Sequence, residues 1–515
     1  MKLKFSTLLI ILLSLTFTTC SDNKIIEEEI IDPVSESVDP IYQLTAEANM
    51  EYNEIMLNWK NPHDKNLIKV EISYKNKELN TRVSPKPILL DAIPGSAGNT
   101  VIEVASSGIY TIQVVAINRA GARSSATTTE CTVNVSNIVE EDHSSVFLSR
   151  ADTLMTTLMD LYLGGQYDVW NDRYPNATGP YWGGAAAVWG QGAGLSAYTA
   201  LRRASTLSET LKAKYSGYDD RFFTSMEQFK NNLSGQGSFA YGTFLGNNDE
   251  RYYDDNVWIG IDMADLYIET QQARYLSNAR MVWNFILEGT DDVAGGGVYW
   301  KEGSKSKHTC STAPAAVLAV KLYQITGEDH FLDAAKDYYA WCKDVLQDPA
   351  DYLYWDNARL TDENDPNSPI RIEKNKYSYN SGQPMQVAAM LYKITNDSRY
   401  LTDAQNIAEA AYKKWFMTFK SYILDETIQI LDPGNTWFQA IMFRGYIELY
   451  EIDGNRKYIE AYENTMHHAW LSSARDKKTK LLSTDFRGGV SHDSWGLLEQ
   501  AACAEMLGRL AILEE

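Results

Sequence analysis

Two adjacent carboxylates, Asp254 and Asp255, are the residues of this chain best suited to catalysis. They open a predicted helix within the run Tyr252-Tyr253-Asp254-Asp255-Asn256-Val257-Trp258. The aromatic neighbours predict a cleft of low dielectric constant, in which one of two close carboxyls keeps its proton near neutral pH, while the helix start favours the other as an anion. One acid and one anion, about 5 Å apart, are what retaining glycoside hydrolysis requires.

A purely structural interpretation of the pair also exists. Aspartate is favoured in the first turn of a helix because it caps free N–H groups and complements the helix dipole. Asp219-Asp220 and Asp291-Asp292 show that such pairs occur elsewhere in the chain. The surrounding aromatic residues and Asn256 distinguish the pair at 254–255, so we expect Asp254 and Asp255 to be catalytic.

Further aromatic and amide side chains fall in Gly-rich or polar segments that we expect to surround the same cleft. Such groups stack on sugar rings and hydrogen-bond to sugar hydroxyls, although packing in the core or in a turn explains any single aromatic residue equally well. The candidate substrate-binding residues are Tyr253, Asn256, Trp258, Trp182, Trp189, Tyr299, Trp300, Trp355, Tyr379 and Asn380. No His or Cys stands at metal-ligand spacing, so we expect neither a metal nor a cofactor.

Composition narrows the class of protein. The chain has 515 residues, 44% of them hydrophobic and 12% aromatic, which excludes a disordered chain. Its net charge is −21, with 47 basic and 68 acidic residues, so nucleic acid is not an expected partner. An acidic chain with 13 Trp and 32 Tyr favours a carbohydrate partner.

The N-terminus predicts export and lipidation. Residues 1–19 have two lysines and then a short apolar run, as in a signal peptide, and Phe17-Thr18-Thr19-Cys20 resembles a bacterial lipoprotein cleavage box. We expect Cys20 to carry the lipid, 20–39 to be an acidic tether, and the lipid to be the sole membrane attachment. Ordinary secretion with an incidental cysteine is the alternative. The other four cysteines are scattered, and we expect buried thiols.

Residues 40–137 predict a small all-β sandwich. Runs such as Val70-Glu71-Ile72-Ser73-Tyr74 alternate between apolar and polar side chains, and turn signals such as Pro94-Gly95 separate them. Trp59 and the run that begins at Tyr110 resemble the core of a fibronectin type III module. No catalytic group appears there, so we expect an accessory module or spacer.

The remaining residues, 145–515, predict paired helices. The pattern Leu-Tyr-x-x-Thr/Asp recurs, for example at Leu322-Tyr323, and an aromatic–aliphatic pair follows each tyrosine by eight residues, which indicates a helix end, a tight turn and a returning helix. Six such pairs predict an (α/α)6 toroid with its long loops around a central cleft; a one-way solenoid is the alternative. The expected helices span 145–163, 185–203, 207–232, 254–270, 272–288, 310–326, 328–347, 379–396, 398–418, 435–453, 455–472 and 493–513.

The helical part resembles glycoside hydrolase family 76, the endo-acting α-1,6-mannanases. The resemblance is carried by Tyr253-Asp254-Asp255-Asn256-Val257-Trp258, by Gly295-Gly296-Gly297-Val298-Tyr299-Trp300, by Ser311-Thr312-Ala313-Pro314-Ala315-Ala316 and by Tyr379-Asn380-Ser381-Gly382. It implies a retaining hydrolase of α-1,6-linked mannan, acting on oligosaccharide or polysaccharide, with Asp254 as nucleophile and Asp255 as general acid/base.

The whole arrangement is similar to glycan-degrading envelope lipoproteins of Bacteroidetes-type bacteria. It implies a secreted lipoprotein at the outer membrane or cell surface, with a periplasm-facing location also open. Two other functions remain open on the same fold. One is a non-catalytic, surface glycan-binding lipoprotein; the other is a different (α/α)6 carbohydrate-active enzyme, such as an unsaturated glucuronyl hydrolase or a sugar epimerase.

Overall fold

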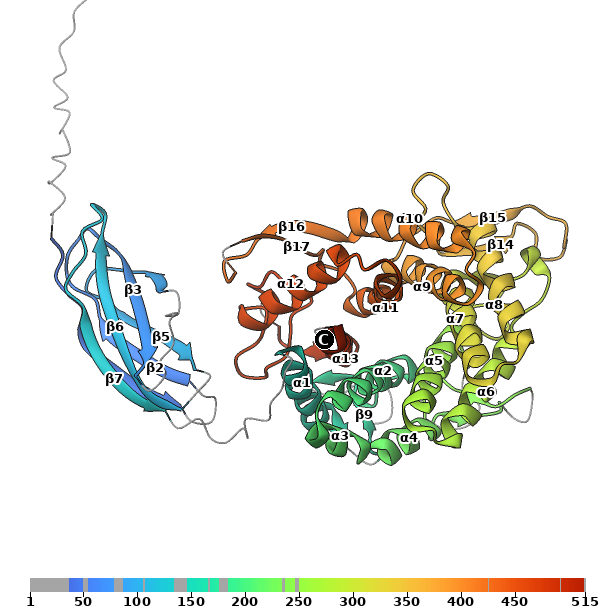
Figure 1. Cartoon of the computed structure of the whole chain (residues 1–515), viewed down its shortest axis with the longest axis horizontal. Helices are drawn as coiled ribbons and strands as arrows, with labels where there is room; N and C mark the ends of the chain where they lie inside the picture. The colour runs from blue at the N-terminus through green and yellow to red at the C-terminus, as the bar shows by residue number, and fades with distance from the viewer. Residues whose placement is uncertain are drawn as a thin grey trace, which may run out of the picture. The chain divides into compact units, whose positions relative to one another are not determined.

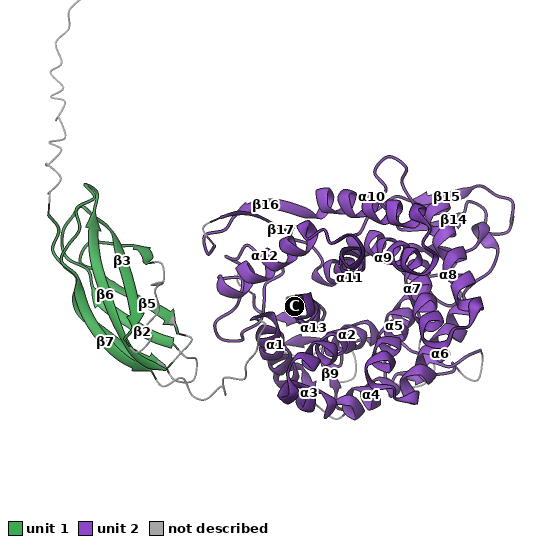
Figure 2. Ribbon diagram, in the orientation of Figure 1, with its two compact units in different colours: residues 1–140 green, residues 141–515 purple. Residues whose placement is uncertain are grey.

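The computed structural model describes residues 37–49, 54–77, 87–104, 107–133, 146–164, 167–175, 184–233, 237–245, 250–424, 426–490 and 492–513. The signal peptide, Cys20, most of the tether and Trp182 lie outside these residues and stay predictions. The chain divides into two units, residues 1–140 and 141–515 (Figure 2). Among the described residues, no helix has the length and apolar character needed to cross a membrane.

The first unit is a β-sandwich of two antiparallel sheets, with strand orders β1-β2-β5 and β4-β3-β6-β7. Alternate side chains of each strand fill the core, among them Trp59, which packs against Gly98 of the neighbouring strand; a Cβ at Gly98 would lie 2.2 Å from the Trp59 ring. Val38, which the sequence analysis assigned to the tether, is buried in this core. The strands are β1 (Tyr42–Asn49), β2 (Glu54–Lys60), β3 (Leu67–Asn76), β4 (Ile88–Asp91), β5 (Ala97–Glu103), β6 (Gly108–Asn118) and β7 (Thr127–Val133).

In the second unit, six described helices form a closed inner ring, and the expected (α/α)6 toroid is confirmed (Figure 1). Each contacts the next in the order given below, and the last contacts the first. Small residues such as those of Ala313–Ala319 let the helices pack closely, and most side chains are buried on every side. The inner helices are α2 (Val188–Ala204), α5 (Tyr253–Thr270), α7 (Thr309–Thr326), α9 (Ser378–Thr395), α11 (Thr436–Asp453) and α13 (Leu497–Leu513).

The outer layer consists of helices with a single buried face, which pack on the inner ring. The single helix expected over 207–232 is wrong: the chain turns at Gly217-Tyr218 and forms two short helices there. The outer helices are α1 (Val146–Tyr162), α3 (Glu209–Ser216), α4 (Asp219–Glu227), α6 (Ala273–Glu288), α8 (Asp329–Trp341), α10 (Ser398–Trp415) and α12 (Lys457–Leu471); η2 (Ser205–Leu207), η3 (Val293–Gly295) and the π-helical η4 (Cys342–Leu346) are short turns.

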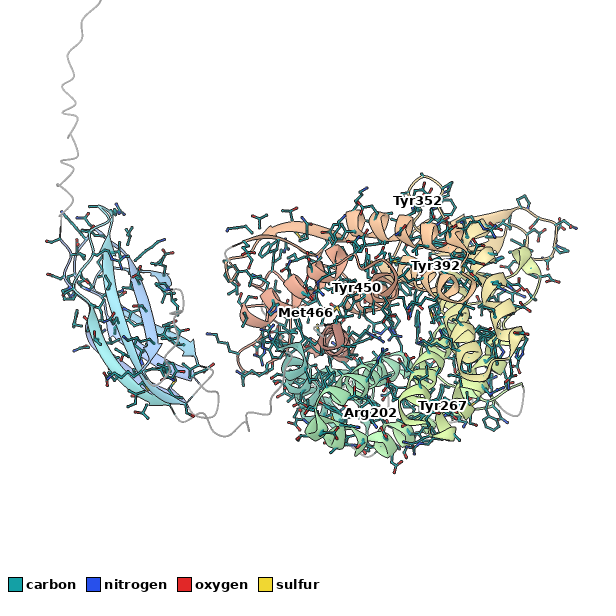
Figure 3. The ribbon with its side chains drawn as sticks, in the orientation of Figure 1. Arg202, Tyr267, Tyr352, Tyr392, Tyr450 and Met466 are labelled. Carbon is teal, nitrogen blue, oxygen red and sulfur yellow. The ribbon has the colours of Figure 1, made fainter. Side chains whose placement is uncertain are left out.

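The repeated tyrosine marks the end of four inner helices, as expected. The residue after each helix is left-handed, and its N–H donates to the carbonyl oxygen of Tyr267, Tyr323, Tyr392 or Tyr450 (three of these are labelled in Figure 3). After three of them the threonine hydroxyl, for example that of Thr326, also accepts the N–H two residues on. The outer helix then begins within a few residues and runs back along its partner.

Short turns and long connections therefore alternate around the ring, and all six inner helices begin at the same face. The long connections, about 20 to 30 residues each, join each outer helix to the next inner one at that face. They carry the short strands β8 (Leu163–Gly164), β9 (Val169–Trp170), β10 (Arg173–Tyr174), β11 (Lys230–Asn231), β12 (Ala240–Tyr241), β13 (Ser306–His308), β14 (Asn357–Leu360), β15 (Ile370–Glu373), β16 (Phe416–Lys420), β17 (Thr427–Leu431) and β18 (Trp495–Gly496).

A buried charge network ties the inner helices together deeper in the ring. Arg444 Nε of α11 donates to Glu505 Oε1 of α13 at 2.7 Å, and Arg509 Nε donates to the same oxygen at 2.7 Å. On α5, Asp262 accepts a hydrogen bond from Ser196 of α2 at 2.5 Å. Burial raises the pKa of Asp262 to about 7, whereas the two guanidinium groups outweigh burial and hold the pKa of Glu505 below its usual range. Removing one partner would leave an uncompensated buried charge.

The closest approach of two inner helices gives a stability prediction. A Cβ at Gly445 of α11 would lie 2.4 Å from the carbonyl oxygen of Gly382 on α9, a distance that forces the two backbones apart. We expect Gly445→Ala to destabilise the helical unit by about 3 kcal/mol, seen in calorimetry as a melting temperature lower by about 5 °C or more.

Gly192→Ala on α2 is the matched control, because a Cβ there would meet Ile259 at an ordinary 3.4 Å. Alanine is the better helix former by about 1 kcal/mol, so this variant should melt at or above the wild-type temperature. Equal melting of Gly445→Ala and wild type would contradict the close packing of α9 and α11.

Candidate active site

A cleft of about 300 Å³ opens where the inner helices begin. Its walls come from the starts of α2, α5, α9 and α11 and from the connections before α5 and α7. The lining residues are Ala187, Trp189, Thr243, Tyr252, Asp254, Asp255, Trp258, Trp300, Tyr379, Trp437 and Phe438. Both predicted carboxylates and four of the predicted substrate-binding aromatics therefore meet in one cleft.

Asp254 is held by donors on both of its oxygens. Its Oδ2 accepts the indole N–H of Trp300 at 2.9 Å and the thiol of Cys310 at 3.5 Å, and its Oδ1 accepts the backbone N–H of Asp255 at 2.9 Å. Burial raises the pKa of Asp254 to about 6, and these donors, which favour the charged form, limit the rise. The group is therefore an oriented anion near neutral pH.

Asp255 lies in the same cleft in a different environment. Among the described residues, none donates a hydrogen bond to its carboxyl group. Burial, followed by the charge of Asp254, raises the pKa of Asp255 well above its usual value. The pair thus consists of one stabilised carboxylate and one carboxyl that keeps its proton, the division of roles that acid-assisted nucleophilic displacement needs.

The indole of Trp300 is fixed by its own neighbours. Its ring stacks on His308 with centroids 5.5 Å apart and meets Tyr252 edge to face at 5.0 Å. Burial lowers the pKa of His308 to about 4, so the imidazole is neutral near pH 7 and adds no charge beside Asp254. Lys307 anchors the connection that carries Trp300, because its Nζ donates to Asp291 Oδ1 at 2.7 Å and to the Gly297 carbonyl at 2.8 Å.

Cys310 reaches Asp254 from the first turn of α7. Its side chain is buried, and burial together with the charge of Asp254 raises the pKa of the thiol well above its usual value. The sulfur therefore keeps its proton and acts as a hydrogen-bond donor. Cys131, Cys310, Cys342 and Cys503 are free and buried, as predicted.

Stacked rings form the part of the cleft wall at the starts of α2, α9 and α11. Tyr379 and Phe438 stack with centroids 4.0 Å apart at 11°, and the indole of Trp189 continues this stack at 6.4 Å. Trp437 meets both Trp189 and Trp258 edge to face, at 5.4 Å and 5.3 Å. Because each ring is braced by the next, the wall presents fixed apolar faces to a ligand.

Five described residues of the predicted substrate-binding set do not line the cleft, and three of them are held by contacts elsewhere. Tyr253 is buried and stacks on Phe285 at 4.5 Å. Asn256 is buried, and its amide bonds to the backbone N–H and carbonyl of Tyr241, so it joins β12 to the start of α5. Tyr299 points to Asp291 instead, with its hydroxyl 3.0 Å from Oδ2. These side chains build the site without facing its ligand.

Gly295-Gly296-Gly297 belong to the connection that carries Trp300. They pass over the ring of Trp341: a Cβ at Gly297 would lie 2.7 Å from it, and the residue has φ +78°. Their role is to turn the connection tightly against the outer layer.

Trp355 and Asn380 belong to a polar group beside the cleft. Asp356 accepts two hydrogen bonds, from Asn380 Nδ2 to Oδ1 at 3.1 Å and from Asn357 Nδ2 to Oδ2 at 2.9 Å. Trp355 lies under the ammonium group of Lys374, which is 4.7 Å from the ring centroid. Asp356 lies near the residues around Asp254, since its charge acts on both His308 and Cys310. None of these residues lines the cleft itself.

Sequence reasoning missed Cys310, Asp356, Trp437 and Phe438. A usable signal for three of them exists: Trp437-Phe438 occupies the same place at the start of α11 as Tyr379-Asn380 occupies at the start of α9, and Cys310 is likewise the second residue of α7. Aligning the inner helices by their starts finds these residues. Asp356 has no comparable signal, because it stands in the long connection before α9. In the part of the chain that the structure describes, no group of three or more His, Cys, Asp or Glu could hold a metal ion.

The chain has relatives of known family. Residues 147–515 match the family described as glycosyl hydrolase family 76. A family 76 glycoside hydrolase from a bovine Bacteroides thetaiotaomicron strain is 39% identical, with a TM-score of 0.72, and the match covers 93% of this chain and 100% of that one. A family 76 mannosidase from Bacteroides thetaiotaomicron VPI-5482 is 46% identical, with a TM-score of 0.69, over 72% of this chain and 99% of that one.

Curated fungal proteins are more distant. A mannan endo-1,6-α-mannosidase of Candida glabrata is 24% identical over 268 residues, which is 50% of this chain and 54% of the relative. The chain spans 65% and 61% of the length of two further relatives, both from Schizosaccharomyces pombe and both 25% identical.

Removing the indole donor to Asp254 gives a prediction for the pH profile. In Trp300→Phe the carboxylate of Asp254 loses a donor that favours its charged form, so its pKa rises and a higher pH is needed to ionise it. We expect the acidic limb of kcat/KM for glycoside hydrolysis to move upward by about one pH unit. An unchanged limb would show that Trp300 does not set the charge of Asp254.

Replacing Cys310 by alanine should shift the pH profile less than Trp300→Phe does, and serine at this position should prevent the shift. Cys310→Ala removes the second donor to Oδ2, and we expect the acidic limb to move upward by about half a pH unit. Cys310→Ser keeps a donor and should leave the limb near its wild-type position. If alanine and serine behave alike, the thiol only fills space.

Proposed function

This chain belongs to glycosyl hydrolase family 76, and on that premise we propose that it cleaves α-1,6-mannosidic linkages within mannan, with retention of anomeric configuration. The observation that carries the proposal is the unequal pair at the start of α5. Asp254 is an anion held by three donors, whereas Asp255 is a carboxyl to which none of the described residues donates.

In the proposed mechanism Asp254 attacks the anomeric carbon while Asp255 gives its proton to the oxygen of the leaving sugar. The bond from Asp254 to the sugar forms as the glycosidic bond breaks. Asp255, now a carboxylate, takes a proton from water, and the resulting hydroxide releases the sugar from Asp254 and restores both groups. The charge of Asp254 acts on Asp255, which supports the short separation that a retaining pair needs.

The wall of stacked rings and the relatives' names support mannan as substrate. Rings at Trp189, Tyr379 and Phe438 present apolar faces to the C–H faces of a sugar chain. Among the relatives described above, one is a family 76 mannosidase and another is a mannan endo-1,6-α-mannosidase. We therefore test cleavage within chains of α-1,6-mannan.

Replacing either aspartate by asparagine should abolish hydrolysis without unfolding the protein. We expect Asp254→Asn and Asp255→Asn each to lower kcat/KM on α-1,6-mannan by about 10³-fold or more. An activated aryl α-mannoside separates the roles: Asp255→Asn should still form the glycosyl–enzyme because this leaving group needs no proton, whereas Asp254→Asn should not. In wild type, proton NMR should show the α anomer as the first product.

Asp220→Asn is the matched control, because Asp219 and Asp220 open α4 as Asp254 and Asp255 open α5, and Asp220 is 88% exposed on the outer layer. It should keep full activity. Unchanged turnover in Asp254→Asn would contradict the proposal. Tight binding of mannooligosaccharide by wild type without any product would favour the glycan-binding alternative.

A further inference from the structure

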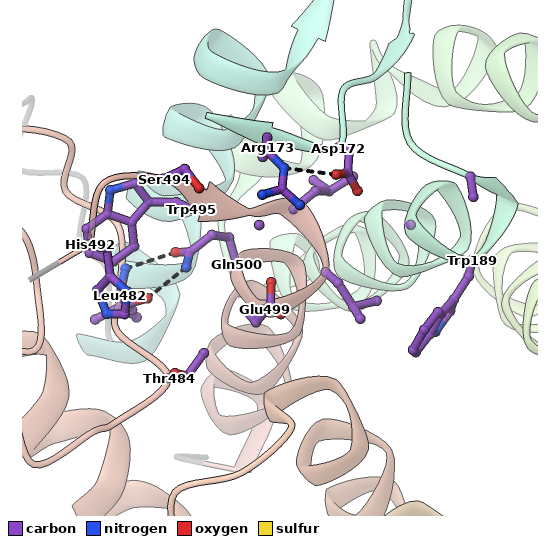
Figure 4. Close-up of a pocket in the computed structure, with 15 residues that line it drawn as sticks. Asp172, Arg173, Trp189, Leu482, Thr484, His492, Ser494, Trp495, Glu499 and Gln500 are labelled. Atoms are coloured by element: carbon purple, nitrogen blue, oxygen red, sulfur yellow. Dashed lines mark hydrogen bonds and ion pairs between the residues drawn. The ribbon is translucent and has the colours of Figure 1, made fainter. Parts of the chain in front are cut away.

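A second pocket adjoins the catalytic cleft on the same face of the ring. Its volume is about 390 Å³, it lies between the start of α2 and the start of α13, and it shares Ala187 and Trp189 with the cleft (Figure 4). We call it the outer pocket. The cleft and the outer pocket are therefore neighbours along one surface, with the Trp189 indole, 36% exposed, at their common edge.

The walls of the outer pocket are fixed by backbone pairing. Arg173 and Tyr174 of β10 pair with Gly496 and Trp495 of β18, and the N–H of Leu497 donates to the Asp172 carbonyl at 2.8 Å. On the opposite wall, the amide of Gln500 bonds to both the N–H and the carbonyl of Leu482, at 2.9 Å and 2.7 Å. A pocket built this way is formed before any ligand arrives.

Polar groups in the outer pocket are available to a ligand. The carboxylate of Glu499 stands in the first turn of α13, and among the described residues it has no hydrogen-bond partner. Gly496 makes room for it, because a Cβ there would lie 2.2 Å from Glu499 Oε2. Arg173 donates through Nε to Asp172 at 3.1 Å and is half exposed, so its outer N–H groups are free to donate further.

The chemistry of these groups fits a neutral polyol. Two carboxylates, Asp172 and Glu499, face one guanidinium, so the field disfavours an anionic ligand such as a phosphate or a uronate. Carboxylate acceptors, guanidinium donors and the hydroxyls of Ser494 and Thr484 match the mixed donors and acceptors of sugar hydroxyls. Figure 4 shows the Glu499 side chain within the pocket, with Arg173 and Asp172 across from it and Trp189 at the edge.

We propose that the outer pocket binds a mannosyl unit of the same glycan at a distance from the cleaved bond, with the chain passing over Trp189. This inference rests on the proposed function, because it assumes mannan in the cleft. Glu499 and Arg173 are binding residues in this account, and the bond-breaking groups stay at the start of α5. The mannosyl unit is either the continuation of the main chain or a branch attached to it.

A series of linear α-1,6-mannooligosaccharides of rising length tests the inference. In wild type kcat/KM should rise once the chain is long enough to reach the outer pocket. In Glu499→Gln and Arg173→Ala that rise should shrink by about five- to tenfold, mainly through KM, whereas the shortest substrates are cleaved at the wild-type rate. Glu209→Gln, on the outer layer with its side chain 89% exposed, is the matched control and should behave as wild type.

Equal effects at every length, or none at any length, would overturn the proposal for linear chains. If only a branched mannan distinguishes the variants from wild type, the bound unit is a branch and not the main chain. If linear and branched substrates both fail to distinguish them, the outer pocket binds no part of the glycan.

A measurement of binding distinguishes a failure of this inference from a failure of the proposed function. Calorimetric titration of the same oligosaccharides into Asp254→Asn and into Asp254→Asn with Glu499→Gln measures binding in the outer pocket without hydrolysis. If wild type cleaves no mannan but Asp254→Asn binds long chains more tightly than the double variant does, the result would contradict the proposed activity and support the outer pocket. Equal affinities would contradict the outer pocket whatever the activity.

Discussion

The direction of the inner helices is the constraint on which the rest of the structure depends. Short turns lead from the inner helices α2, α5, α7, α9 and α11 to the outer layer, and long connections lead back from the outer helices, so six inner helices begin at one face. Residues far apart in sequence, from Trp189 to Phe438, become neighbours because each stands in the first turn of its helix. The buried network of Arg444, Glu505 and Asp262 lies deeper in the ring, where it links α5, α11 and α13. These charged groups are therefore separate from the cleft at the helix starts.

Asp254 and Asp255 are chemically identical side chains, and their different neighbours in the cleft make their carboxyl groups behave differently. Both residues lie in the first turn of α5, so the helix end alone does not distinguish them. The difference comes from outside the helix: the connection before α7 supplies Trp300, and the first turn of α7 supplies Cys310, both directed at Asp254. Asp255 receives neither donor and carries the additional charge of its neighbour. Supporting residues such as Asn256 and Lys307 hold these elements in place without reaching the ligand.

Local patterns in the sequence were enough to predict much of this. The repeated tyrosine at helix ends encodes a left-handed turn that needs no distant contact, so the paired helices and the toroid follow from it. The aspartate pair with its aromatic neighbours was equally visible. Side-chain direction was not: Tyr253 and Asn256 flank Asp254 and Asp255, yet the helical twist turns both into the core. The break of the expected 207–232 helix, and the position of Asp356 beside the cleft, depend on how the chain between the inner helices folds, which no local pattern records.

The most direct test of the account is to trap the glycosyl–enzyme. A 5-fluoro-α-mannosyl fluoride extended by an α-1,6-linked mannosyl unit should react with wild type and leave a slowly hydrolysed ester. Mass spectrometry of the digested protein should then place one added disaccharide on the peptide that contains Asp254, and fragmentation should locate it on that residue. An adduct on Asp255 or on another side chain, or no adduct together with a first product of inverted configuration, would contradict the account.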